Sequence, residues 1–169
     1  MSESEVTSII EVINESFSKT IPPDDNADAI FGPGWHPEQE SFMEMIHGKD
    51  WKGFLEVLET SDQAQVYGRM FNFMTPYAYH YYAPAFLIFS MNEEADILAD
   101  AFLSSLHGAG SEFVTQGREY QQQRIQERLI QFSESQKHAI ALVIDYYYRI
   151  NGAYLPDQQN LVVSWSKWL

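Results

Sequence analysis

The chain has 169 residues, of which 45% are hydrophobic and 15% aromatic, enough apolar material for the packed core of one domain. It contains no cysteine, which excludes disulfides, thiolate–metal sites and a cysteine nucleophile. Its formal net charge of −14 repels nucleic acid and anionic lipid and attracts basic proteins. We therefore expect a protein partner, and neither nucleic-acid nor membrane binding.

The negative charge is concentrated in the first third of the chain. Residues 1–62 hold 14 of the 24 Asp and Glu residues against three lysines, whereas residues 118–169 hold five acids and six bases. An acidic surface of this kind either keeps a protein in solution or attracts a basic partner. The composition leaves both interpretations open.

From the sequence we expect no signal peptide and no membrane span. Its first five residues, Met1 to Glu5, are acidic and lack the basic start and apolar run of a signal peptide. The most apolar stretch, residues 83–91, is nine residues long, well below the roughly 20 needed to cross a bilayer. We expect a soluble, cytoplasmic protein.

Apolar residues recur every three or four positions along most of the chain, the spacing of helices with one buried face. Residues 21–37, rich in proline and glycine, are expected to form a loop. Capping residues before the periodic segments, and glycine or proline after them, set the expected boundaries. Helices are predicted over about 3–19 and 38–47, from Asp50 through Leu58, from Ser61 or Asp62 through Phe71, over about 76–90, from Asn92 to Gly108, from Ser133 to Asn151, and from Asp157 onward.

These segments predict an all-α fold. No stretch shows sustained alternation of polar and apolar residues, so no sheet is expected. Residues 108–132, rich in glutamine, are compatible with a loop or with a polar helix. Pro84 lies inside a predicted helix and should kink or split it, because proline removes a backbone hydrogen bond. We expect one domain over residues 1–169, an irregular bundle of about seven to eight helices kinked at Pro84.

No sequence motif indicates catalysis or a cofactor. No two of the five histidines are three or four positions apart, as a helical metal-binding pair requires. The chain lacks a nucleophile elbow and a phosphate-binding loop. The sequence thus predicts no metal, no cofactor and no catalytic residue. The alternative is a metal-dependent hydrolase with a site assembled from the dispersed residues His80, His138, Glu134 and Asp145.

Three consecutive tyrosines, at positions 146–148, lie in one predicted helix. Successive residues are rotated by about 100° around a helix, so the three cannot all face one core. At least one must reach the surface or another element. Tyr146 and Tyr148 are candidates for contact with a partner, the alternative being tyrosines at the core edge with hydrated hydroxyl groups.

The only locally basic segment contains Arg118, Arg124 and Arg128 among several glutamines. An RNA-binding arm needs more positive charge than this. The segment is expected to be a solvated helix, or a patch that contacts the acidic third of the same or a neighbouring chain.

Three stretches resemble an uncharacterised family of small bacterial helical proteins. They are residues 51–58, the run Tyr-Tyr-Ala-Pro-Ala-Phe at 81–86, and residues 132–144 with Gln136. The family has a YYxPA-like run and a late SxxQ helix start, and Ala83 and Phe132 stand here where its pattern has leucine. The resemblance implies an all-helical fold and brings no activity and no catalytic residue.

The favoured function is a non-catalytic, acidic protein-binding domain, such as a toxin-neutralising immunity protein or an antitoxin-like inhibitor. Opposite charge speeds encounter with a basic partner, and buried aromatic residues then hold it. Self-association into a homo-oligomer is a further hypothesis. The charged part of the predicted binding surface consists of Asp24, Asp25, Asp28, Glu38, Glu40 and Glu44.

Overall fold

The computed structural model describes residues 3–34, 37–63, 68–92, 96–106, 123 and 126–169. Within these ranges all regular structure is helical, and the predicted all-α, single-domain fold is confirmed. Besides the ten helices named below, residues 62–63, 123 and 126–129 are also helical. The helices are α1 (Glu3–Ser16), α2 (Ala27–Phe31), α3 (Gln39–Ile46), α4 (Trp51–Thr60), η1 (Gly68–Phe73), α6 (Pro76–Phe89), α7 (Asp96–Ser104), α9 (Glu134–Asn151), α10 (Pro156–Trp165) and η3 (Ser166–Trp168).

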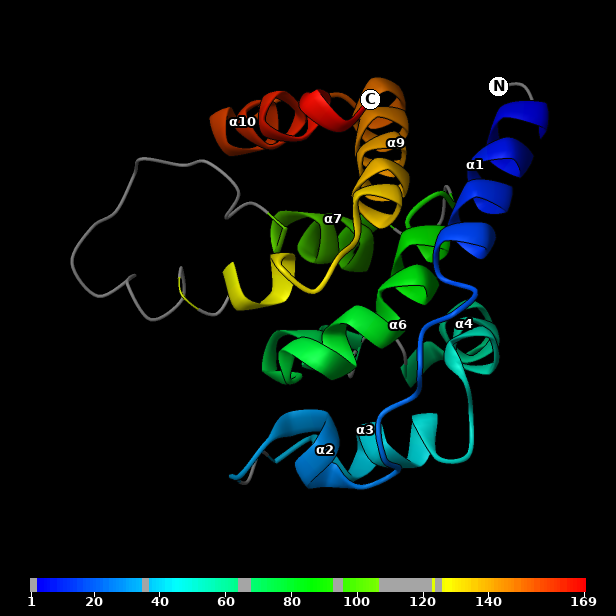
Figure 1. Cartoon of the computed structure of the whole chain (residues 1–169), viewed down its shortest axis with the longest axis vertical. Helices are drawn as coiled ribbons and strands as arrows, with labels where there is room; N and C mark the ends of the chain where they lie inside the picture. Colours follow the sequence, from blue (N-terminus) through cyan, green and yellow to red (C-terminus); the bar gives the residue numbers. More distant parts are fainter. Residues whose placement is uncertain (1–2, 35–36, 64–67, 93–95, 107–122, 124–125) are drawn as a thin grey trace.

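The helix α6 forms the centre of the molecule. Most of its residues are buried. The helix is apolar on all sides and has no polar face that could be exposed to water. It continues through Pro84 as one helix, which excludes a split, one of the two outcomes predicted for this proline; the other, a kink, stays a prediction. Figure 1 shows α4 along one end of α6, α1 beside α9, and α2 with α3 at the end of the molecule opposite both termini.

Several predicted boundaries were wrong for local reasons. The expected loop over 21–37 contains α2, whose start is capped by the Asn26 side chain accepting from the backbone N–H of Ala29 at 2.9 Å. The last helix starts at Pro156, before the predicted cap Asp157. Part of the predicted segment through Phe71 is the 3-10 helix η1. Residues 64–67 and 93–95, Gly108 and most of 108–132 lie outside the described residues.

Aromatic rings from four helices meet around Phe86 in α6. Its ring centroid lies 4.9 Å from that of Phe102 in a stacked arrangement and 5.4 Å from those of Phe54 and Phe71 in edge-to-face arrangements. All four side chains are almost fully buried. These geometries add attraction beyond the burial of apolar area. The cluster therefore joins α4, η1, α6 and α7 into one core.

Arg128 is buried, although the sequence predicted a solvated segment. Its guanidinium donates hydrogen bonds to the carbonyl oxygens of Phe71, Asn72 and Met74 at 2.8–3.1 Å, and lies 4.3 Å from the ring centroid of Tyr79. The carbonyls at the end of η1 are a favourable place for a cation. The prediction of a solvated helix is thus wrong for Arg128, while Arg118 and Arg124 lie outside the described residues.

The tyrosines at 146–148 all pack inside the molecule. Each is at most 6% exposed, and Tyr148 donates a hydrogen bond from its hydroxyl to the Asp100 carboxylate of α7 at 3.0 Å. Burial, and then the Asp100 charge, raise the pKa of Tyr148. Tyr148 reaches another element, and Tyr147 and Tyr148 also line the wall of a second, smaller pocket. Tyr146 and Tyr148 are therefore core residues, which corrects their assignment as partner contacts.

Candidate functional site

The six acids predicted to form a charged surface are all exposed and lie at one end of the molecule. We define this acidic end as the α2–α3 region carrying them. Glu40 and Glu44 are four residues apart on α3 and so share one helix face. The structure therefore places at one end of the molecule the segments that carry the predicted residues: Asp24, Asp25, Asp28, Glu38, Glu40 and Glu44.

One of these acids has a structural role. The carboxylate of Asp25 accepts a hydrogen bond from the backbone N–H of Gly48 at 3.1 Å and lies 2.9 Å from Nδ1 of His47. These contacts join the segment before α2 to the end of α3. Asp24, Asp28, Glu40 and Glu44 form no ion pair with any described residue, so their charge faces solvent.

Exposed apolar side chains lie beside the acidic end. Ile21 is 71% exposed, and Phe73 and Tyr77 are each 43% exposed. The Tyr77 hydroxyl donates to the Ile21 carbonyl at 2.9 Å, which ties the start of α6 to the segment before α2. Thr75, between Phe73 and Tyr77 in sequence, donates from its backbone N–H to the Ile30 carbonyl at 2.7 Å. The apolar side chains therefore adjoin α2.

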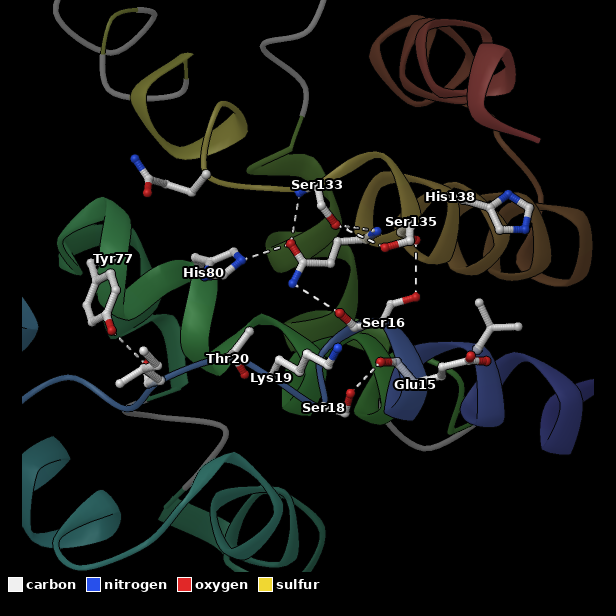
Figure 2. Close-up of a pocket in the computed structure, with 14 residues that line it drawn as sticks. Glu15, Ser16, Ser18, Lys19, Thr20, Tyr77, His80, Ser133, Ser135 and His138 are labelled. Atoms are coloured by element: carbon white, nitrogen blue, oxygen red, sulfur yellow. Dashed lines mark hydrogen bonds between the residues drawn. The ribbon is translucent and has the colours of Figure 1, made fainter.

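A cavity of about 960 Å³ lies between the end of α1, the first turns of α6 and the first turn of α9 (Figure 2). Ile21 and Tyr77 form its boundary toward the acidic end. Apart from Val12, the remaining lining residues carry polar side chains, although apolar atoms make up more of the wall's area. The lining residues are Val12, Glu15, Ser16, Ser18, Lys19, Thr20, Ile21, Tyr77, His80, Gln131, Ser133, Ser135, Gln136 and His138.

Gln136 joins the three helices at the back of this cavity. Its Oε1 accepts from the Ser133 backbone N–H at 2.9 Å, and its Nε2 donates to the Ser16 carbonyl at 3.2 Å. A rotated amide would face one donor with another donor and one acceptor with another acceptor, so this orientation is determined. The predicted capping box of Ser133 and Gln136 is confirmed. The side chain also attaches α1 to α9.

The orientation of Gln136 determines the tautomer of His80. The Nε2 atom of His80 lies 2.9 Å from Oε1 of Gln136, and an amide oxygen only accepts. Nε2 of His80 therefore carries the hydrogen, which leaves a lone pair on Nδ1 when the ring is neutral. Burial lowers the pKa of His80 from 6.5, while the hydrogen bond to Gln136 opposes this shift. The neutral ring is the favoured form near pH 7.

This depressed pKa makes a prediction about stability. Below about pH 6.5 the unfolded chain binds a proton at His80 more readily than the folded protein does, so stability falls as the pH drops below that value. Replacement of His80 by glutamine keeps a donor for Gln136 and removes the titration. In chemical denaturation at about pH 7.5 and 5.5, the wild type should lose more stability on acidification than His80→Gln. Equal losses would show that burial does not depress this pKa.

The residues of the hydrolase alternative do not converge. His80 and His138 both line the cavity, but Glu134 binds Lys137 at 2.7 Å and the Trp168 indole at 3.1 Å. Asp145 lies 3.6 Å from Arg149, farther along α9. In the part of the chain that the structure describes, no three His, Asp or Glu side chains are placed to hold a metal ion.

Sequence reasoning missed most of the cavity wall. The segment with Ser16, Ser18, Lys19 and Thr20 contains only common polar residues, and no spacing within it indicated a site. The signal that could have indicated it was the capping glutamine Gln136, because a buried amide requires several partners. Those partners lie in α1 and α6, far away in sequence.

None of the helices in the described ranges has both the length and the apolar character needed to cross a membrane. The resemblance to a bacterial family stays a prediction. The sequence matches no protein-family model, and no curated protein and no solved structure is detectably similar to it.

Proposed function

We propose that this chain is a non-catalytic binding protein whose acidic end holds a basic protein partner. The proposal is supported mainly by Asp24, Asp28, Glu40 and Glu44, whose exposed carboxylates lack ion pairs with the described residues. Their uncompensated charge attracts a positively charged surface and raises the rate of encounter. The finer proposal is a cytoplasmic immunity protein or antitoxin-like inhibitor that covers a basic toxin.

The apolar residues beside the acidic end give this proposal a second support. Protein interfaces combine an apolar or aromatic centre with a charged rim. Ile21, Phe73 and Tyr77 supply such a centre next to α2. Charge alone would bring a partner close, whereas these side chains offer area that is removed from water in the complex.

Two variants with equal net charge test the proposal. The test variant neutralises the acidic end with D24N, D28N, E40Q and E44Q, and the control neutralises four exposed acids elsewhere with E3Q, E11Q, E127Q and D157N. Each is used to capture partners from an extract of the native host at low salt, followed by quantitative mass spectrometry. A basic protein should bind the wild type and the control, and about ten-fold less of it should bind the test variant.

The control separates a local surface from a general charge effect. Equal weakening in both variants would show that net charge, and not the acidic end, attracts the partner. Capture of no basic protein by the wild type at low salt would contradict the proposed function. Salt should also weaken capture, because exposed charges are screened.

A further inference from the structure

The cavity wall next to the acidic end offers many hydrogen-bond acceptors and few donors. Four of its hydroxyl groups donate their hydrogens to backbone carbonyl oxygens of this chain, at 2.8–3.2 Å. A hydroxyl engaged in this way offers a ligand only its lone pairs. The four bonds run from Ser16 to Ser135, from Ser18 to Glu15, from Thr20 to Phe17 and from Tyr77 to Ile21.

Both histidines of the cavity offer acceptors as well. Nε2–H of His80 is engaged by Gln136, so Nδ1 carries the lone pair of the neutral ring. Nδ1 of His138 lies 2.6 Å from the Trp168 carbonyl oxygen, which can only accept, so Nε2 carries the lone pair there. In Figure 2, His80 lies between Tyr77 and Ser133, whereas His138, on α9, lies at the opposite side of the view from Tyr77.

The remaining groups add one charge of each sign. Glu15 supplies an exposed carboxylate and Lys19 an exposed ammonium group, and neither has an ion pair with a described residue. The other side-chain donors of the wall are the second N–H of the Gln131 amide, the second N–H of the Gln136 amide, and the one hydroxyl hydrogen of Ser133 and Ser135 that their mutual bond leaves over. Acceptors therefore outnumber donors among the lining groups.

We infer that this cavity receives an arginine side chain of the basic partner. A guanidinium has five N–H donors in a planar fork and no acceptor, which complements hydroxyl lone pairs and imidazole nitrogens. A carboxylate or phosphate only accepts, and most of this wall could not donate to it. A lysine ammonium has its three donors on one atom, which suits acceptors from three separate helices less well.

The location of the cavity links it to the proposed function, on which this inference rests. Ile21 and Tyr77 lie between the cavity and the acidic end. A partner seated on the acidic end can therefore extend a side chain past them. The partly exposed Tyr77 ring also offers a face on which a guanidinium can stack. The volume of about 960 Å³ accommodates this group with neighbouring backbone.

A small probe tests the cavity without the partner. The full-length, 15N-labelled protein is titrated with Nα-acetyl-arginine methylamide and followed by amide and imidazole NMR signals. We expect shifts at residues 15–20, at His80 and at 131–138, which form the wall. The comparison probes are Nα-acetyl-citrulline methylamide, of the same shape but uncharged, glucose, acetate and inorganic phosphate. These probes should shift the same signals less, or not at all.

Exposed residues of α1 and the segment after it provide matched variants. Glu15→Gln removes the carboxylate of the wall and should lower the affinity for the arginine probe about two- to five-fold. Lys19→Gln removes a cation that repels the probe, and should raise the affinity for the probe by a similar factor of about two to five. Glu11→Gln, an exposed acid of α1 outside the cavity, should change nothing. An anionic ligand would respond to Glu15→Gln and Lys19→Gln in the opposite directions.

The outcomes distinguish this inference from the proposed function. Equal or stronger responses to phosphate, acetate or glucose, or no response to the arginine probe in the millimolar range, would overturn the arginine site. The variant that neutralises the acidic end should no longer bind the partner, but should still bind the arginine probe. If the probe binds but no basic protein is captured, the cavity assignment stands as a cation site and the proposed function fails.

Discussion

Replacement of Phe86 by alanine is expected to lower the free energy of unfolding by about 3–5 kcal/mol, the range for deleting a large buried ring. Phe86 is 1% exposed and contacts the rings of Phe54, Phe71 and Phe102. The substitution removes these contacts and leaves a cavity that the surrounding helices can fill only in part. Urea unfolding followed by circular dichroism measures the loss.

An exposed phenylalanine supplies the control for this change. Phe73 is 43% exposed, so Phe73→Ala removes less buried area and should cost about 1 kcal/mol or less. Phe86→Leu keeps an apolar side chain and should lie between the two alanine variants. Similar losses for Phe86→Ala and Phe73→Ala would show that Phe86 is not at the centre of the core.

Replacement of Arg128 by alanine is expected to cost about 2–4 kcal/mol, because it removes charged hydrogen bonds to buried carbonyls and a desolvated cation–π contact. The guanidinium contacts the carbonyls of Phe71, Asn72 and Met74 and the ring of Tyr79. Burial raises the pKa of Tyr79 to about 12, so this ring stays neutral beside the cation. The same unfolding measurement checks the loss.

Two further arginine variants separate the causes of that loss. Arg128→Lys retains the charge but not the planar fork, and should recover only part of the stability. Arg69→Ala removes an exposed arginine of η1 and should change stability by about 0.5 kcal/mol or less. If Arg128→Ala were no worse than Arg69→Ala, the buried contacts would contribute nothing to folding.

Most of the helices follow from local sequence features. The side chain of Asp50 accepts from the Gly53 backbone N–H at 2.8 Å, and Thr75 caps α6, as their positions before apolar periodic segments predict. Ser133 and Gln136 form the predicted capping box. These contacts connect residues three positions apart, so they can be identified in the sequence without knowledge of the fold.

Other features depended on contacts that are distant in sequence. Arg128 belongs to a polar, glutamine-rich segment, and its burial follows from carbonyls more than 50 positions earlier. The tyrosines at 146–148 can all be buried because α9 is covered by α1 and α10 and lies close to α6, and the Tyr148 hydroxyl reaches Asp100 of α7. Helical spacing predicts which face of a helix is buried when the opposite face is exposed to solvent. It does not describe a helix that is covered on several sides.

The sequence by itself determined the helical class, most helix positions and the placement of negative charge on residues 1–62, because periodicity, capping and charge are local properties. Tertiary structure decided that the segments carrying the acids of 24–44 lie at one end and that Ile21 and Tyr77 border a cavity. It also set the tautomers of His80 and His138 through Gln136 and the Trp168 carbonyl. Hydrogen-bond partners across a cavity depend on the relative positions of α1, α6 and α9, which the packing of their apolar faces establishes.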